Sequence, residues 1–352
     1  MKFGLFYQLP CAPEQDEVTR YNDTMEQIVC ADALGFDVAW LAELHFNRAF
    51  SIMPAPLIVA AVLAQRTRRI RLGLAVALLP LQHPLRTAEE AATVDLLSQG
   101  RLELGVGRGT IAIHFQGLNV PRDESRVRFE EALTILERAW TQEICAFDGT
   151  YYHVPPTRVV PRPVQKPYPP LRIAANSTDS AIFAGTRGYP VFLASPINPL
   201  QKLPEHIHLY RQAFRDTGHR DKRPDVATLF FTQVADSAAQ ARQQVEPSTM
   251  HYFRTITQQA RLGEGDQAVS YAYLQEVRQR QESLTWNDID TGMGVYGSPS
   301  ACIQKIKEIH KLCGMDQLIC WFNPGGLVPH QQVLANMRRF AEDVMPAVRE
   351  LE

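Results

Sequence analysis

Short apolar runs alternate with longer amphipathic stretches along most of the chain. Such runs are typical of parallel strands that are covered on both faces, whereas a half-exposed antiparallel strand would alternate apolar and polar residues. We predict eight strands on this basis. They are Lys2 to Gln8, Asp37 to Glu43, Ile70 to Ala77, Leu102 to Gly107, Leu171 to Ala175, Val191 to Ala194, Ala227 to Ala235 and Gln317 to Phe322.

Amphipathic segments with helical spacing lie between these strands. They include Thr24 to Leu34, Ala88 to Leu97, Glu124 to Gln142, Leu203 to Asp216, Pro299 to Leu312 and Gln331 to Val344. Regular alternation of strand and helix predicts an α/β protein, here a (β/α)8 TIM barrel that forms one domain over residues 1–352. An open, doubly wound sheet is the alternative, because alternation alone does not show whether the sheet closes.

Two stretches interrupt the alternation. Residues 147–152, Phe-Asp-Gly-Thr-Tyr-Tyr, predict a hairpin with an Asp-Gly turn, and a proline-rich connector follows. Residues 246–292 are polar and rich in Gln and Arg, and we interpret them as an insertion after the seventh strand. A long loop in a compact domain is usually an active-site lid or a disordered segment, and both readings stay open here.

Composition narrows the function classes. The 352 residues are 45% hydrophobic and 21% charged, which suits a globular protein with a sizeable core. A net charge of -2, without a run of basic and aromatic residues, makes nucleic acid an unexpected partner. The N-terminus lacks a signal-type apolar stretch and no segment is long enough to span a bilayer, so we expect a cytoplasmic protein with no membrane partner.

Cysteine usage gives no sign of a metal centre. The six cysteines are scattered, and none forms the C-x-x-C spacing of a zinc site or a redox pair. We therefore expect reduced thiols and no bound metal.

The glycines Gly105, Gly107 and Gly109 follow the fourth predicted strand. They superficially match a dinucleotide fingerprint, but the third glycine comes one residue too early and no helical pattern starts at once. A Rossmann site is therefore not favoured. The glycines indicate either a tight strand-to-loop turn or close approach of the backbone to a flat cofactor.

Several phrases, all in the same order along the chain, resemble those of bacterial luciferase and its flavin-dependent monooxygenase relatives. The resemblance extends over nearly the whole chain and is weakest between residues 246 and 292. The phrases are MKFGLFYQ at the start, GFDVAWLAELHF (35–46), GLAVALLPLQHPLR (73–86), LLSQGRLELGVGRG (96–109), RIAANSTDSAIFAG (172–185), YGSPSACIQKIKEI and RRFAEDVMP (338–346).

The resemblance implies an enzyme that inserts one oxygen atom from O2 into a small organic substrate: an aldehyde, a ketone or a biosynthetic intermediate. The family uses reduced FMN (FMNH2), supplied by a separate NAD(P)H:flavin reductase, and works through a C4a-peroxyflavin. A homodimer is expected, with helices near residues 55–64 and 88–97 in contact. Two alternatives remain open, namely a deazaflavin-dependent dehydrogenase and a flavin-binding relative that has lost catalysis.

The resemblance also implies where the FMN phosphate binds. Arg108, after the fourth strand, matches the arginine that pairs with this phosphate, and a guanidinium group suits a phosphate dianion. Asn176, Ser177 and Ser180 stand where the fifth strand leads into a helix, so N–H groups and hydroxyls there are expected to bind the same phosphate. Asp179 is assigned to the helix dipole instead, because it would repel an anion.

The flavin ring is expected to lie between the third and sixth strands. Ala75 and Val76 occupy the place of the family's non-proline cis peptide bond, which lies against the ring. Ala194 and Ser195 stand in the sixth-strand region where luciferase has serine and tryptophan, so the packing of the ring on that side differs.

Three residues are predicted to be catalytic, namely Glu43, His45 and His83. Glu43 and His45 end the second strand, at the barrel face where catalytic groups are expected. Luciferase has a histidine at the position of Leu44, and leucine transfers no proton, which argues against luciferase's own reaction. His114 is interpreted either as a substrate contact or as a solvated loop residue.

Overall fold

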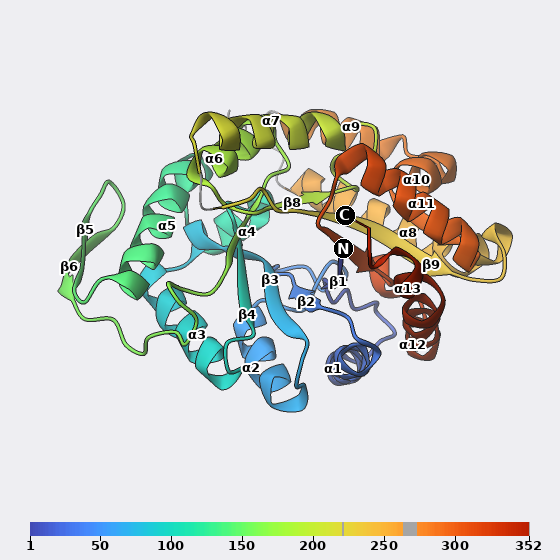
Figure 1. Ribbon diagram of the computed structural model, residues 1–352, viewed down its shortest axis with the longest axis horizontal. Coiled ribbons are helices and arrows are strands. Elements are labelled where there is room, and N and C mark those ends of the chain that lie inside the picture. The colour runs from blue at the N-terminus through green and yellow to red at the C-terminus, as the bar shows by residue number, and fades with distance from the viewer. Residues whose placement is uncertain (220–221, 263–272, 352) are drawn as a thin grey trace.

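The computed structural model describes residues 1–219, 222–262 and 273–351. Within these residues eight parallel strands form a closed barrel surrounded by helices (Figure 1). Neighbouring strands pair in sequence order, and the last strand pairs with the first, which closes the ring. The strands are β1 (Lys2–Tyr7), β2 (Val38–Leu41), β3 (Arg71–Leu78), β4 (Leu102–Gly107), β7 (Leu171–Ala174), β8 (Val191–Ala194), β9 (Val226–Val234) and β11 (Gln317–Trp321). The predicted barrel is confirmed, and the open sheet is excluded.

One buried strand escaped prediction. β10 (Gly294–Gly297) pairs with the second half of β9, from Phe231 to Val234, whereas β8 pairs with the first half, from Val226 to Leu229. The sequence Gly-Val-Tyr-Gly has glycine at both ends, so it lacks the apolar run from which the other strands were predicted. The long strand β9 therefore holds two successive neighbours on one edge.

Helices cover the outside of the barrel (Figure 1). They are α1 (Glu17–Leu34), α2 (Pro56–Arg66), α3 (Pro84–Leu97), α4 (Ala112–Gly117), α5 (Ser125–Thr141), α6 (Thr178–Arg187), α7 (Leu203–Asp216), α11 (Pro299–Cys313), α12 (His330–Arg339) and α13 (Met345–Val348). Helix α1 begins earlier than predicted because the Asp16 side chain caps it, accepting the Thr19 N–H at 2.8 Å. Among the helices described, none has the length and apolar character needed to cross a membrane.

The predicted hairpin is present, and the described part of the predicted long loop is mostly helical. Strands β5 (Cys145–Asp148) and β6 (His153–Thr157) pair antiparallel. In the stretch 246–292 the chain forms α8 (Ala238–Leu262), α9 (Tyr273–Glu282) and α10 (Trp286–Gly292), while residues 263–272 lie outside the described residues. A polar composition rich in Gln and Arg suggested a loop, but buried apolar side chains such as Phe253 hold α8 against the barrel.

The interior of the barrel is filled by one indole ring. Trp40 of β2 is fully buried, its Nε1–H donates to Gln317 Oε1 at 3.2 Å, and its ring meets the Phe192 ring edge-on at 4.6 Å between centroids. The neighbouring strands carry glycine opposite this ring. A Cβ atom at Gly73 would lie 2.1 Å from the indole, and one at Gly4 would lie 2.9 Å away. These two glycines make the space that the tryptophan occupies.

We predict that Gly73→Ala destabilises the protein through this contact. Overpacking of a well-filled core typically costs about 1–3 kcal/mol of the free energy of unfolding. The same change in a Trp40→Leu background should cost much less, because leucine lacks the six-membered ring that the added methyl group would meet. Urea denaturation of the wild type, both single variants and the double variant measures the coupling. Additive losses would show that the two positions do not compete for space.

Candidate active site

A largely apolar cavity of about 300 Å³ opens where the barrel strands end. Side chains near the carboxyl ends of most strands line it, which is where barrel enzymes place their active sites. The lining residues on the strands or directly after them are Phe6, Ala42, Ala75, Val76, Gly107, Ile173, Phe192, Ala194, Leu229, Ile319 and Trp321. Phe192 lies between the cavity and the buried Trp40, so the filled core forms the floor of the site.

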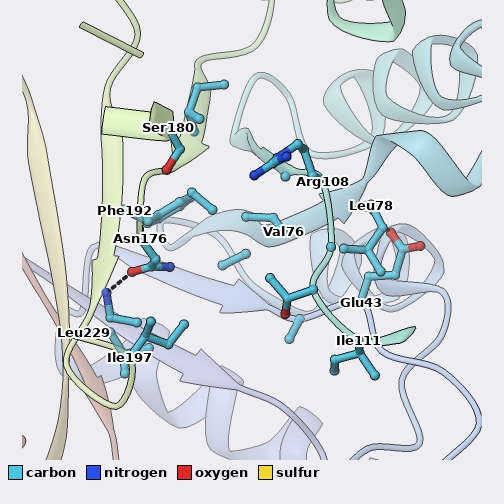
Figure 2. A pocket seen from close by; sticks show the side chains of 18 of the residues that line it. Glu43, Val76, Leu78, Arg108, Ile111, Asn176, Ser180, Phe192, Ile197 and Leu229 are labelled. Atoms are coloured by element: carbon cyan, nitrogen blue, oxygen red, sulfur yellow. Dashed lines mark hydrogen bonds between the residues drawn. The ribbon is translucent and has the colours of Figure 1, made fainter. Parts of the chain in front are cut away.

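One end of the cavity is suited to an anion. Ser177 caps α6, with the Ser180 N–H at 3.3 Å from Ser177 Oγ and the Ser177 N–H at 3.0 Å from Ser180 Oγ. Figure 2 shows Arg108 and Ser180 at the same end of the cavity. A helix N-terminus carries partial positive charge and an arginine carries a full one, so together they favour a phosphate group.

Two further charged side chains from α5 reach this end. Arg126 lies 3.3 Å from Asp179 and 3.5 Å from Glu130, and all three line the cavity. Asp179 lies in the first turn of α6, as expected for a residue that favours the helix dipole. No sequence motif pointed to Arg126 or Glu130, because on a helical pattern they are indistinguishable from ordinary surface positions.

Beside the anion end, the backbone of β3 bulges into the cavity. Its register against β4 shifts between Leu74 and Ala77, and the Ala75–Val76 peptide bond is cis, as the resemblance implied. On β4, a Cβ atom at Gly107 would lie 2.6 Å from Val76 Cγ2. Gly107 thus serves close packing against the bulge, whereas Gly109 has a left-handed φ of 78° and serves a turn.

Asn176 fixes the wall opposite the bulge. Its side-chain oxygen accepts the Ala194 N–H at 2.9 Å, shown as a dashed line in Figure 2, and its backbone oxygen accepts from Asn198 Nδ2 at 3.0 Å. Ala194 lines the cavity, but Ser195 is fully buried and donates to Met293 O at 3.2 Å. The amide of Asn176 therefore holds the end of β8 in place.

Helix α9 holds the loop that follows β8. Gln281 Nε2 donates to the backbone oxygen of Pro196 at 3.1 Å, and the Arg280 guanidinium donates to that of Ile197. Pro196 and Ile197 both line the cavity. This part of the wall is thus fastened from outside through backbone atoms.

Glu43 is buried and bound by three donors. Its carboxylate accepts from the Leu78 N–H at 3.0 Å, from Gln82 Nε2 at 2.7 Å and from His45 Nε2 at 3.1 Å. Because Leu78 ends β3, the carboxylate ties the bulged strand to the end of β2. These contacts suit a positioning residue better than a group that exchanges protons with a substrate.

The three residues predicted to be catalytic, Glu43, His45 and His83, do not all line the cavity. His45 bonds to Glu43 and is not among the lining residues, whereas Leu44 lines the cavity. His83 is exposed at the start of α3, where its ring packs on Tyr152 at 6.0 Å between centroids. Of the predicted residues, the cavity brings together Glu43, Ala75, Val76, Arg108, Asn176, Ser177, Ser180 and Ala194.

His114, unlike His45, lines the cavity. It belongs to α4 and is 1% exposed, and its Nε2 accepts the His45 N–H at 3.2 Å. Burial, together with the nearby His45, lowers the pKa of His114 to about 4. Its ring is therefore neutral at physiological pH, and the solvated-loop alternative is wrong.

Part of the cavity wall is apolar and comes from elements that the sequence analysis did not assign to the site. Tyr252 and Ile256 come from α8, which was predicted as a loop, and Phe50 comes from the segment after β2. Trp321, left open as core or pocket wall, lines this cavity and packs on Tyr252 at 4.9 Å. Within the described part of the chain, no group of three or more His, Cys, Asp or Glu side chains could hold a metal ion.

Comparison with known proteins agrees with this arrangement. A family model described as luciferase-like monooxygenase matches residues 1–316. The chain is 27% identical over 370 residues to the oxygenase component of the flavin-dependent trigonelline monooxygenase of Acinetobacter baylyi, covering 99% of this chain and 96% of that protein.

Solved structures share the fold over almost the entire chain. The monooxygenase RslO1 from Streptomyces bottropensis has a TM-score of 0.81 at 28% identity, covering 98% of this chain and 99% of that one. The oxygenating constituent of 3,6-diketocamphane monooxygenase from Pseudomonas putida, a type II Baeyer–Villiger enzyme solved with FMN, has a TM-score of 0.81 at 20% identity, covering 99% and 98%.

The low pKa of His114 predicts a loss of stability in acid. As pH falls from 6.5 towards 4, the unfolded chain takes up a proton on this residue while the folded protein, where His114 faces His45 and the Glu43 carboxylate behind it, does not. At pH 5 this preferential protonation of the unfolded chain lowers the free energy of unfolding by about 2 kcal/mol. His114→Gln lacks this group, so the wild-type free energy of unfolding should fall more than that of the variant between pH 7.5 and 5. Urea denaturation measures both. If the wild type and His114→Gln lost the same free energy of unfolding between pH 7.5 and 5, a buried, neutral imidazole at position 114 would be contradicted.

Proposed function

We propose that this chain, which belongs to the luciferase-like monooxygenase family, is the oxygenase of a two-component system. It takes reduced FMN from a separate NAD(P)H:flavin reductase and uses O2 to insert one oxygen atom into a small organic substrate. The observation that carries this proposal is the cavity itself, in which an anion-binding end adjoins a bulged strand and an apolar chamber. The A. baylyi relative, whose name designates an oxygenase component, supports the reductase partner.

The residues present fit FMN. Arg108 and the N-terminal turn of α6 would hold its one terminal phosphate, because they offer a guanidinium group and main-chain N–H groups at the same end. The flat ring would lie against Ala75 and Val76, where the glycine at 107 lets two strands approach closely. The FMN bound in the P. putida enzyme supports the choice of this flavin.

Bound reduced flavin would supply the electrons that activate O2. The chain's own residues then have three tasks, namely to anchor the phosphate, to keep the ring aligned and to keep water away from the reacting atoms. Glu43 contributes to the second task by holding the end of β3 just beyond the bulge. His45 supports Glu43 through their hydrogen bond, so we assign it a positioning role in place of a direct one.

Anaerobic titration with reduced FMN, followed by mixing with isotopically labelled O2 and candidate carbonyl compounds, tests the proposal. Wild-type protein should bind FMN, and the product should gain one labelled oxygen atom. Arg108→Ala should weaken FMN binding by about 1.5–3 kcal/mol, the range for hydrogen bonds to charged groups. Arg66→Ala, an exposed change on α2, is the matched control.

The same experiment separates the alternatives. A deazaflavin-dependent dehydrogenase would bind the deazaflavin in preference to FMN and would transfer no oxygen to a substrate. A relative without catalysis would bind FMN and neither consume O2 nor form product. Equal FMN affinity in the wild type and in Arg108→Ala would remove Arg108 from the phosphate site.

We also propose a homodimer that forms through α2 and α3. These helices lie side by side, joined by a hydrogen bond from Gln65 Nε2 to Leu97 O at 3.1 Å. Their outer faces carry apolar side chains that are unusually exposed, among them Ile58 at 69% and Leu97 at 45%. Small clusters of this kind are buried in isologous interfaces.

Sedimentation velocity at micromolar concentration measures the state of association. We expect a dimer for the wild type and a monomer for Ile58→Asp, because a buried unpaired carboxylate is costly. Val18→Asp, on the equally exposed surface of α1, is the control and should remain dimeric. A monomeric wild type would contradict the proposal.

A further inference from the structure

The hydrogen bond of His114 fixes which ring nitrogen carries the proton. Its Nε2 lies 3.2 Å from the backbone nitrogen of His45, and an amide N–H can only donate. Nε2 must therefore accept, and a neutral imidazole that accepts at one nitrogen is protonated at the other. Turning the ring over would bring the Cε1–H group against that amide and lose the bond. The Nδ1–H tautomer is thus set by the backbone.

The backbone that sets the tautomer is itself held firmly. The neighbouring Leu44 N–H donates to Met53 O at 3.2 Å, and the His45 side chain bonds to the buried Glu43 carboxylate. On the other side, the His114 N–H donates to Ile111 O at 3.1 Å, which fixes the start of α4. Neither partner of the hydrogen bond can move without breaking further bonds.

His114 lies beside Ile111, whose backbone oxygen accepts its N–H at 3.1 Å. Figure 2 shows Ile111, three residues before it, at the end opposite Arg108 and Ser180. Among the described residues, the His45 N–H is the hydrogen-bond partner of the ring. Nδ1 is not among the buried polar atoms that lack a partner, so it reaches the open space of a cavity that Leu44 and Phe50 also line.

Other polar side chains that line the cavity behave differently. The Glu43 carboxylate is already bound by three donors. Gln8 and Thr110 also line the cavity, but an amide can turn over and a hydroxyl can rotate, so either can serve as donor or acceptor. Unlike Gln8 and Thr110, His114 offers a donor that cannot become an acceptor, a property it shares with the indole N–H of Trp321.

We propose that His114 determines substrate specificity by donating its Nδ1–H to an acceptor oxygen, such as a carbonyl, on an uncharged and otherwise apolar substrate. This inference rests on the proposed function and names the substrate class of the same site. A site with a fixed buried donor rejects an analogue without the acceptor, because the donor then stays unpaired. An apolar wall at the same place would not distinguish the two molecules.

A matched pair of probes tests this. 2-Acetylnaphthalene and 2-isopropenylnaphthalene have nearly the same shape, but the first has a carbonyl oxygen where the second has a methylene group. We expect wild-type protein, with or without oxidised FMN, to bind the ketone about tenfold more tightly than the hydrocarbon. Fluorescence or calorimetric titration measures both affinities.

Two variants separate donation from a structural role. His114→Phe keeps an aromatic ring and removes the donor, so the ketone preference should fall to about one. His114→Gln can accept from the His45 N–H with its oxygen and donate with its nitrogen, so it should keep most of the preference. Because the ketone and the hydrocarbon are compared on the same variant, general damage to the cavity weakens both affinities and leaves their ratio unchanged.

Nitrogen NMR of histidine-labelled protein gives an independent readout, because it distinguishes the two neutral tautomers. We expect Nδ1 protonation, with a shift of its resonance when the ketone binds. Protonation at Nε2, or an undiminished ketone preference in His114→Phe, would overturn the inference. Both readouts need no turnover, so a protein that binds ketone through His114 but transfers no oxygen would defeat the proposed function and leave this inference standing.

Discussion

The packing of Trp40 against two glycines is the constraint on which the rest of the structure depends. The indole fills the lower barrel because Gly4 and Gly73, on the strands to either side, have no side chains to displace it. Phe192 reaches across from β8 and covers the ring. With the core closed at this level, the strand ends above it can enclose a cavity.

Above this floor, the site is built mainly from backbone geometry and from side chains that hold it. The bulge in β3, the end of β8 and the start of α6 all line the cavity. The side chains of Glu43 and Asn176 bind backbone N–H groups of these segments and so hold them in place.

The sequence predicted the barrel well because each buried parallel strand is a nearly unbroken apolar run. It missed β10, whose two glycines interrupt the pattern, and α8, whose polar residues resemble those of a loop. In the site, the residues at fixed strand ends were found, but His45 was preferred to His114. Sequence does not show which of several residues beyond a strand end turns inward, and the contact between His45 and His114 joins segments far apart in the chain.

The way α9 holds the loop after β8 bears on how such enzymes diversify. Arg280 and Gln281 bind the carbonyl oxygens of Ile197 and Pro196, and every amino acid supplies that same oxygen. Position 197 can therefore accumulate substitutions that alter the shape of the chamber while the path of the main chain is preserved. Mutation at α9 would have the reverse effect, since it would release the whole segment at once. Substitutions at position 197 can therefore change substrate selectivity in small steps without affecting the contacts that keep the protein folded.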